Sequence, residues 1–577
     1  MLIALVLLAH SWAVHLDSTL SFIGLTAQDI TFRNDYTIAD PYRFLLVDSL
    51  LKNPLYAVDV IKCIDEGFWD KPDCTVLQNL ISLYGFQLPI KKTDFKEGIA
   101  DAHRLIREAF RETPRELHRV FEELILFSPE PTGSIEEEKE GEKQYDSLVQ
   151  FLKEQGTAID YERLFDAGVV LLSALTNYSV WTQQLKHERE EIEGVEGDVV
   201  YYEKCLFGEI VIGDTGRNAY TKDFTVIIDY GGDDMYQFGA QTGGIHIIID
   251  KAGDDVYRGE NYAIACGHFG ISILIDEEGN DTYEAQSFSI GCAVFGIGLL
   301  LDREGDDRYT GDTFTEGAGG FGIGIIKDEA GQDRYEGALY AQGFGSTYGI
   351  GILGDRDGNE RYTIAKKYLD EGRYLDHYLS LSQGFAIGFR PDLSAGIGMI
   401  LDRNGHDSYL ADIFAQGSSY WYGIGALVDG DGNDDYVAYQ YAQGSGTHIT
   451  IGLLVDERGD DNYIAKGVSQ GCGHDLSFGL LLDNEGDDSY VAFDLSQGAG
   501  NANGVGVLID ECGDDSYSVK RTHNTQGYGD FRREYGSIGV LLDLQGKDIY
   551  RSGQDNSLWQ KGTYGIGVDW YGTDFSP

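Results

Sequence analysis

Proline, cysteine and basic side chains are all scarce in this chain, and each shortage excludes a class of protein. Only 9 of the 577 residues are proline against 76 glycines, which indicates regular tight turns and not a disordered linker. Seven cysteines are an odd number and too few for a disulfide framework. The 44 Lys and Arg are outnumbered by 96 Asp and Glu, giving a formal net charge of −52. We therefore expect no nucleic acid and no anionic membrane surface as a partner, because both attract basic surfaces.

Long hydrophobic runs are also missing. No stretch approaches the roughly 20 apolar residues of a membrane-spanning helix, so we expect no membrane span. Leu2–Ala9 has about the length of the apolar part of a signal peptide, and Ser11-Trp12-Ala13 could supply the cleavage site, but no Lys or Arg precedes the run. Residues 1–13 are therefore a candidate signal peptide, which predicts an extracytoplasmic protein: secreted, periplasmic or at the cell surface. The alternative is a buried N-terminal helix.

Signatures of common enzyme classes are absent too: the chain has no HExxH, GxSxG, P-loop or paired CxxC motif. Cys-Gly-His occurs twice, at Cys266-Gly267-His268 and Cys472-Gly473-His474. Either copy could offer metal ligands, or a nucleophile with its base. The two copies lie far apart in a repeat array and cannot form one site.

What fills the last 350 residues is one repeated phrase, Asp-x-x-Gly-x-(Asp/Glu)-x-Tyr. Most copies start 26 or 27 residues apart, and such a period marks an array of stacked units. This length suits one coil of a parallel β-helix and is too short for a propeller blade, which needs about 40 residues. We predict a mainly β fold, a parallel β-solenoid of about 12 coils over residues 208–577. The leading aspartates are Asp229, Asp250, Asp276, Asp302, Asp328, Asp355, Asp402, Asp429, Asp456, Asp483, Asp510 and Asp543.

Each repeat reads as a strand, a turn and a second strand. In one copy, Ile297–Asp302 is the first strand, Arg303–Asp306 the turn, and the second strand starts near Asp307. Glycine at the fourth position of the turn permits a positive φ. Residues one, two and three places before the leading Asp are mostly apolar, so both faces of the first strand should be covered. The N-terminal helices, or a self-association surface, would cover the outer face, which Lys327 and Gly354 interrupt.

Residues 27–200 are predicted to form an α-helical domain. Asp101–Phe127 has apolar residues at helical spacing, with a break at Pro114, and Tyr145–Leu185 offers two further helices. Between them, the charge run Glu136–Lys143 is predicted to be a solvated loop.

Stacking the coils about 4.8 Å apart aligns two ladders of acids. Unit charges at this spacing repel by roughly 1 kcal/mol per neighbouring pair in water and about 3–4 kcal/mol at an effective dielectric of 20. Backbone N–H groups, cations or protons must offset this repulsion, or the side chains must splay into solvent. The second ladder, at the sixth position of the phrase, comprises Asp234, Asp255, Asp281, Asp307, Asp333, Glu360, Asp407, Asp434, Asp461, Asp488, Asp515 and Asp548.

The turns Gly279-Asn280-Asp281-Thr282-Tyr283 and Gly305-Asp306-Asp307-Arg308-Tyr309 resemble the second half of the calcium-binding nonapeptide of RTX proteins. The resemblance implies Ca²⁺ as a cofactor. The alternative is that the leading Asp caps the turn by accepting backbone N–H bonds while the sixth-position acid faces solvent. The metal ligands that the resemblance predicts are Asp229, Asp234, Asp250, Asp255, Asp276, Asp281, Asp302, Asp307, Asp456, Asp461, Asp483, Asp488, Asp510 and Asp515.

Three further columns of the array have structural interpretations. The tyrosines could form a stacked core ladder or an outward aromatic stripe for sugars. Glutamines seven residues after the tyrosines, such as Gln342 and Gln443, suit an amide ladder. Cys266 and Cys292 share one phase on neighbouring coils, so we expect buried free thiols.

Function is expected on faces and insertions. The long coil from Asp355 to Asp402 carries an insertion near residues 366–382. The architecture is similar to that of parallel β-helix lyases and tailspikes, which implies a polysaccharide groove there. We predict a structural or binding/adhesion module, stabilised by calcium, with a polysaccharide or protein partner. The alternative is a carbohydrate-active enzyme, a lyase or hydrolase, with candidate catalytic residues Asp370, Glu371, Arg373 and Asp376.

Overall fold

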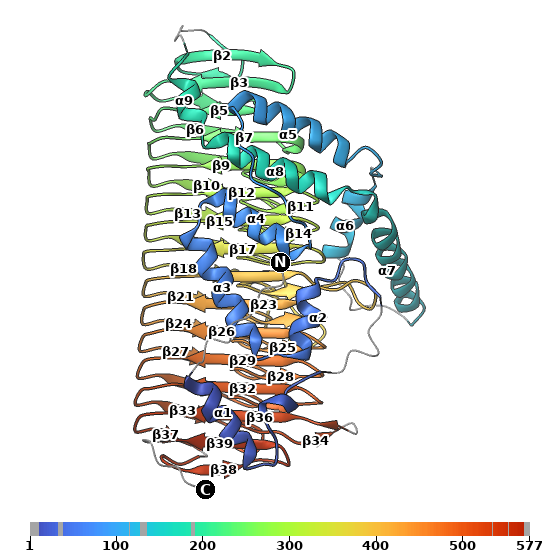
Figure 1. Ribbon diagram of the computed structural model, residues 1–577, viewed down its shortest axis with the longest axis vertical. Coiled ribbons are helices and arrows are strands. Elements are labelled where there is room, and N and C mark those ends of the chain that lie inside the picture. The colour runs from blue at the N-terminus through green and yellow to red at the C-terminus, as the bar shows by residue number, and fades with distance from the viewer. Residues whose placement is uncertain are drawn as a thin grey trace.

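The computed structural model describes residues 11–32, 39–114, 116–126, 135–185, 191–532, 535–551 and 553–570. It confirms the predicted architecture, a mainly β chain that forms a parallel solenoid of about 12 turns with helices at residues 11–182 (Figure 1). No helix within the described ranges is long and apolar enough to cross a membrane.

The strands of successive coils stack into three parallel ladders, of which the third is formed by only some of the coils. In the coil analysed above, β12 (Ile297–Leu301) precedes the turn, β13 (Arg308–Thr310) follows it, and the short β14 (Gly319–Gly320) completes the circuit. Ile297 pairs with Ile323 of the next coil, so equivalent residues lie side by side. The predicted strand–turn–strand reading is confirmed.

The first ladder contains the longest strands. It runs through β3 (Gly208–Gly213), β5 (Val226–Ile228), β7 (Thr242–Ile249), β9 (Gly267–Ile275), β12, β15 (Ile323–Lys327), β17 (Ile350–Gly354), β20 (Ile397–Leu401), β23 (Ile424–Asp429), β26 (Ile451–Asp456), β29 (Phe478–Asp483), β32 (Val505–Asp510), β36 (Ile538–Asp543) and β39 (Gly565–Asp569).

The other two ladders have shorter strands. The second runs through β4 (Ala219–Tyr220), β6 (Met235–Phe238), β8 (Val256–Gly259), β10 (Thr282–Glu284), β13, β16 (Arg334–Gly337), β18 (Arg361–Ile364), β21 (Ser408–Leu410), β24 (Asp435–Val437), β27 (Asn462–Ile464), β30 (Ser489–Ala492), β33 (Ser516–Val519) and β37 (Ile549–Tyr550). The third consists of two-residue strands: β11 (Ala293–Val294), β14, β19 (Ala386–Ile387), β22 (Ser419–Tyr420), β25 (Gly446–Thr447), β28 (Gly473–His474) and β31 (Gly500–Asn501).

The solenoid interior is filled by tyrosines of the second ladder and by the aliphatic residue two places before each leading Asp. Tyr309 and Leu300, for example, are both fully buried in this core. Neighbouring rings stack within 11° of parallel at centroid distances of 4.6–5.0 Å. The tyrosines therefore form the core ladder and not an outward stripe. The stack comprises Tyr220, Tyr236, Tyr257, Tyr283, Tyr309, Tyr335, Tyr362, Tyr409, Tyr436, Tyr463, Tyr490, Tyr517 and Tyr550.

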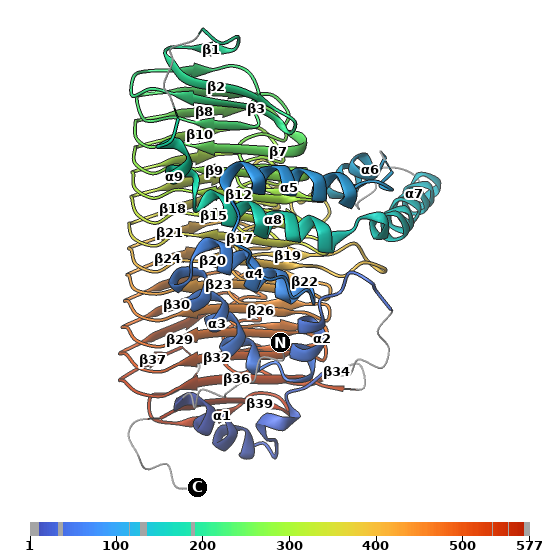
Figure 2. The same cartoon turned by 45° about the horizontal axis from the view of Figure 1, so that its top comes forward.

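The apolar outer face of the first ladder is covered by the chain's own helices, as predicted. Ile297 and Leu299 on this face share one hydrophobic core with residues of the helices, which lie across the strands in both views (Figures 1 and 2). This cover accounts for the doubly apolar strands without self-association. The helices are α1 (Ser11–Ser21), α2 (Leu45–Lys52), α3 (Tyr56–Asp70), α4 (Asp73–Leu83), α5 (Phe95–Ala109), α6 (Leu117–Ile125), α7 (Ile135–Gln155), α8 (Tyr161–Leu175) and α9 (Tyr178–Thr182).

The two residues that interrupt this face match the helices above them. The Lys327 Nζ lies 3.3 Å from a carboxylate oxygen of Asp73 at the start of α4. At Gly354 an added Cβ would lie only 2.4 Å from the ring of Phe68 on α3, so the absence of a side chain lets the helix approach. The cover is continuous across both positions.

Of two predictions for the helical region, the break at Pro114 is right and the loop at Glu136–Lys143 is wrong. The break at Pro114 is confirmed, since it falls between α5 and α6. The charge run Glu136–Lys143 is not a loop but part of α7, because Glu and Lys are good helix formers that a solvated helix can carry. Lys139 and Glu140 are exposed there.

The candidate signal peptide lies largely outside the described residues, which start at Ser11. The proposed cleavage residues Ser11-Trp12-Ala13 open α1, and Trp12 is 3 % exposed. The Trp12 backbone N–H donates to Glu511, just after β32 in the C-terminal part of the solenoid, at 3.1 Å. In this structure α1 therefore packs against the solenoid as a buried N-terminal helix would.

The turn glycines meet a steric requirement in addition to the conformational freedom that the sequence suggested. Gly253 and Gly459 do have positive φ, at 154° and 156°. The stronger constraint is space: a Cβ on Gly305 would lie 1.7 Å from the carbonyl oxygen of Gly279, its equivalent in the preceding coil. Glycine is required because backbones of successive turns touch.

Candidate metal centre in the turns

The leading aspartates are buried beneath the turns and bonded to the tyrosine stack. Asp302 is 0 % exposed, and its Oδ2 accepts the hydroxyl hydrogen of Tyr283 from the preceding coil at 2.6 Å. The same bond recurs along the array, for example from Tyr436 to Asp456 at 2.6 Å. Some leading aspartates also cap their own turn, as one alternative predicted: Asp456 Oδ1 accepts the backbone N–H of Arg458 at 3.1 Å.

The sixth-position acids are also buried, so the prediction that they face solvent is wrong. Asp307 is 2 % exposed, and its Oδ1 accepts the backbone N–H of Asp281 in the preceding coil at 2.6 Å. The fifth-position Asp306 is exposed and bonds in the other direction along the solenoid: it accepts the backbone N–H of Gln332 in the following coil at 3.0 Å. The turn N–H groups thus find partners on neighbouring coils, which draws the sixth-position carboxylate inward.

The structure brings the two predicted acidic ladders together between neighbouring coils. One oxygen each from Asp281, Asp302 and Asp307 lies within 4.8 Å of the others. Asp302 Oδ1, Asp281 Oδ2 and Asp307 Oδ2 are buried and have no hydrogen-bond partner within the described chain. Comparable triads occur along the array, among them Asp229, Asp234 and Asp250; Asp250, Asp255 and Asp276; Asp307, Asp328 and Asp333; and Asp333, Asp355 and Glu360. The predicted ligands Asp456, Asp461, Asp483, Asp488, Asp510 and Asp515 are likewise at most 2 % exposed, and each has one unpartnered oxygen except Asp456.

Among the described residues, no Lys, Arg or His side chain forms an ion pair with the carboxylates of the triads named above. Burial raises the pKa of Asp302 well above its usual range, and the neighbouring carboxylates of Asp328 and Asp307 raise it further. Arg303 follows Asp302 in sequence, but its guanidinium pairs with Asp73 on α4 at 2.7 Å. Protons or bound cations are therefore needed to neutralise the file of carboxylates.

Two residues of the first coil, next to these ladders, were not predicted. Tyr220 extends the tyrosine stack by one ring, and Asn218 occupies the place of the sixth-position acid in the same coil. The Asn218 Nδ2 donates to Asp229 Oδ2 at 3.0 Å, so an amide ends the acidic ladder. Because Ile212 pairs with Ile228, Gly213 holds the place of the leading Asp, so this turn contains neither of the two acids by which the repeated phrase was recognised.

The candidate catalytic residues do not converge on one another. The insertion folds as a small antiparallel hairpin bridged between Leu369 and Tyr378. Asp370 is 5 % exposed and pairs with Arg373 at 2.6 Å. The side chain of Asp376 is 83 % exposed, and Glu371 is exposed as well. One acid is held by an arginine while two face solvent, an arrangement without a shared reaction centre.

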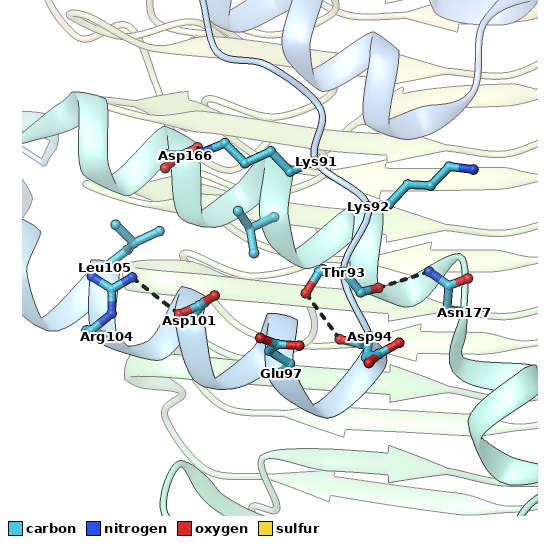
Figure 3. Close-up of a pocket in the computed structure, with 11 residues that line it drawn as sticks. Lys91, Lys92, Thr93, Asp94, Glu97, Asp101, Arg104, Leu105, Asp166 and Asn177 are labelled. Atoms are coloured by element: carbon cyan, nitrogen blue, oxygen red, sulfur yellow. Dashed lines mark hydrogen bonds and ion pairs between the residues drawn. The ribbon is translucent and has the colours of Figure 1, made fainter.

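A separate hollow lies in the helical layer, between α5 and α8 (Figure 3). It encloses about 540 Å³. Two ion pairs lie in its lining: Arg104 is 3.3 Å from Asp101, and Lys91 is 3.9 Å from Asp166.

Comparison with protein families, with curated proteins and with solved structures finds no match at any of the three levels. The resemblance of the turns to RTX repeats therefore stays a prediction.

Proposed function

We propose that this protein is an extracytoplasmic β-solenoid that binds Ca²⁺ between its coils and serves as a rigid structural or binding module. One observation carries the proposal: buried carboxylate oxygens without hydrogen-bond partners, such as Asp302 Oδ1 and Asp307 Oδ2, recur in successive turns. An unpaired buried charge is costly, so a ligand that pairs with these oxygens would stabilise the fold.

The donor set favours calcium over other cations. Carboxylates are hard oxygen ligands, which suit Ca²⁺ and Mg²⁺ better than zinc or copper. Ca²⁺ tolerates irregular geometry, whereas Mg²⁺ demands a near-ideal octahedron and retains several waters. Carboxylates that are 0–2 % exposed, such as Asp302 and Asp307, leave little access for those waters. The leading and sixth-position acids would hold the ions.

Other contacts around the triads support a structural role. Tyr283 holds one oxygen of Asp302, and the N–H of Asp281 holds one oxygen of Asp307, so both carboxylates are oriented before any ion binds. Bound cations would then replace repulsion between neighbouring coils by attraction. The solenoid would be stiff when loaded.

The test is thermal unfolding of the full chain in millimolar CaCl₂, in EDTA and in MgCl₂. The full chain is needed because the helices cover the apolar outer face of the solenoid. At about 100 times its dissociation constant, calcium should add about 2.7 kcal/mol per independent site, so we expect a rise of many degrees in the midpoint. Equal midpoints in CaCl₂ and EDTA would disprove the proposal.

A matched pair of variants localises the ions. Asp307→Asn removes a charge from the file but keeps an oxygen for the Asp281 N–H bond, so it should lower the number of calcium ions bound per chain in equilibrium dialysis. Asp306→Asn is the control, since Asp306 is exposed and accepts an equivalent N–H bond from Gln332. Equal stoichiometry in the two variants would place any bound calcium elsewhere.

A further inference from the structure

Two cysteine side chains lie in contact on neighbouring coils of the solenoid. Gly267 of β9 pairs with Ala293 of β11, and Cys266 and Cys292 immediately precede these residues. Both thiols are buried, as predicted, with Cys266 1 % and Cys292 0 % exposed, and both are free in this structure. The Cys292 thiol donates to the Cys266 Sγ at 3.3 Å. The stacking of the coils therefore holds two sulfur atoms next to each other.

The same column of the array brings side-chain atoms together a second time. Two of its later members, Ser418 and Ser445, have their hydroxyl oxygens 3.1 Å apart. Cys472 is also a member, but its neighbours in the column are Ser445 and Ala499, which carry no sulfur. The pairing of the residues that follow defines the column: Cys266, Cys292, Ala318, Phe344, Phe385, Ser418, Ser445, Cys472 and Ala499.

The geometry of the cysteine pair suits a covalent bond. In-register residues of neighbouring parallel strands have Cα atoms about 4.8 Å apart, and disulfides join Cα atoms roughly 4.4–6.8 Å apart. The two sulfur atoms would close from 3.3 Å to about 2.05 Å, a movement that side-chain rotation can supply. We propose that Cys266 and Cys292 are a modification site at which oxidation forms a disulfide between neighbouring coils.

The oxidant is another disulfide, carried by a protein or by a small thiol compound. One cysteine thiolate attacks a sulfur of this disulfide and releases the first thiol, and the second cysteine attacks the mixed disulfide and releases the other. The pair thus loses two electrons and two protons, and the oxidant leaves as two thiols. The step rests on the extracytoplasmic location of the proposed function, because disulfides persist in oxidising compartments.

The bond forms during folding and is protected afterwards. Burial and the hydrogen bond with Cys266 raise the pKa of Cys292 well above its usual range, so the folded chain contains little of its thiolate. Exchange also needs an accessible sulfur, and therefore takes place before these coils close. The finished bond links residues 26 positions apart and restricts the unfolded chain, which stabilises the fold.

The test compares the full chain made in a reducing bacterial cytoplasm with the chain made in a cytoplasm that lacks its disulfide reductases. Each sample is quenched with acid, unfolded without reductant and treated with a maleimide mass tag. The tryptic peptide of residues 259–303 carries both thiols. We expect it to be untagged and two hydrogen atoms lighter than the reduced peptide in the oxidised sample, and doubly tagged in the reduced one.

A matched pair of serine variants isolates the bond. Cys292→Ser removes one partner and should fold, because Ser418 and Ser445 already occupy this column. Its Cys266 should take a tag in both samples. Cys472→Ser is the control, and it should keep the linked peptide. In thermal unfolding without reductant, the oxidised wild type should unfold several degrees above the reduced protein, and this shift should vanish in Cys292→Ser alone.

A doubly tagged peptide in the oxidised sample would overturn the inference, as would a thermal shift of equal size in Cys292→Ser. Because the host supplies the oxidising conditions, a negative result would concern the thiols and not the natural location of the protein. The calcium proposal fails separately, since its test compares CaCl₂ with EDTA at a fixed state of the thiols.

Discussion

Glu316 is a buried acid outside the turns, at a position that holds glutamine in later coils. In the following coil the equivalent Gln342 donates from its Nε2 to the backbone carbonyl of Tyr335 at 3.0 Å. Glu316 is 0 % exposed, and burial raises its pKa to about 8. Near neutral pH it is therefore largely protonated, and the neutral acid has nearly the shape of the glutamine amide.

Glu316→Gln should remove a pH dependence from the stability of the fold. A group whose pKa is raised to about 8 in the folded state stabilises fully below its unfolded value and loses that contribution as pH rises through 8. The variant should therefore gain several degrees over wild type at pH 9 and little at pH 5, in thermal unfolding at both pH values. The exposed Glu260→Gln is the control, and an equal gain at both pH values would contradict the assignment.

At the scale of the element, the helices and the first ladder fit each other residue by residue. Burial alone would raise the pKa of Asp73 at the start of α4, but Arg303 and Lys327 lower it below its usual value. Lys327 is 4 % exposed and also lies 3.3 Å from Glu329. The site is thus a small ion cluster between helix and sheet, where other coils place aliphatic side chains.

Asp73→Asn should destabilise the chain by about 1–3 kcal/mol, because it weakens the pairing of a buried ammonium. The double variant Asp73→Asn/Lys327→Leu also removes the ammonium and places an aliphatic side chain in this column of the first ladder. It should recover most of the lost stability. Urea unfolding of the two variants measures the difference. A double variant less stable than Asp73→Asn alone would show that Lys327 contributes through other contacts.

Periodicity made the elements predictable, but not the direction of every side chain. Leu300 and Tyr309 could be placed from the repeat on strands, whose residues alternate between faces, although the sequence left open whether the tyrosines lie in the core or face outward, which the structure decides. The burial of Asp307 could not be predicted, since a turn residue has no such alternation and its burial depends on an N–H group one coil away. Nor could the Asp302–Tyr283 bond be read from the pattern, because it joins residues of different coils. The same limit hid the role of Gly305, which the carbonyl of Gly279 imposes.

At the scale of the whole molecule, the parallel ladder ends in antiparallel hairpins. β2 (Val199–Cys205) closes one end against β3, and β38 (Leu558–Gln560) closes the other against β39. The charged residues Glu203 and Lys204 on β2 disfavour pairing of that edge with a strand of another molecule. Trp559 covers Gly567 and donates from Nε1 to the Gln526 carbonyl at 3.1 Å.

Trp559→Ala should loosen this cap and expose the edge of β39 to a second molecule. We expect sedimentation coefficients that rise with protein concentration in the variant, and constant ones in wild type. A variant that stays monomeric at every concentration would show that the short hairpin alone protects the end.

The buried tyrosine stack also has an optical consequence. Its rings lie within 11° of parallel and no more than 5.0 Å apart, from Tyr220 to Tyr550. Chromophores this close exchange excitation, so light absorbed by one ring can be emitted by another several coils away. Parallel transition moments preserve polarisation during such transfer, and the last ring lies 5.1 Å from Trp559. The molecule thus contains a one-dimensional array of phenol chromophores that ends at an indole, and tyrosine excitation should emerge as tryptophan fluorescence.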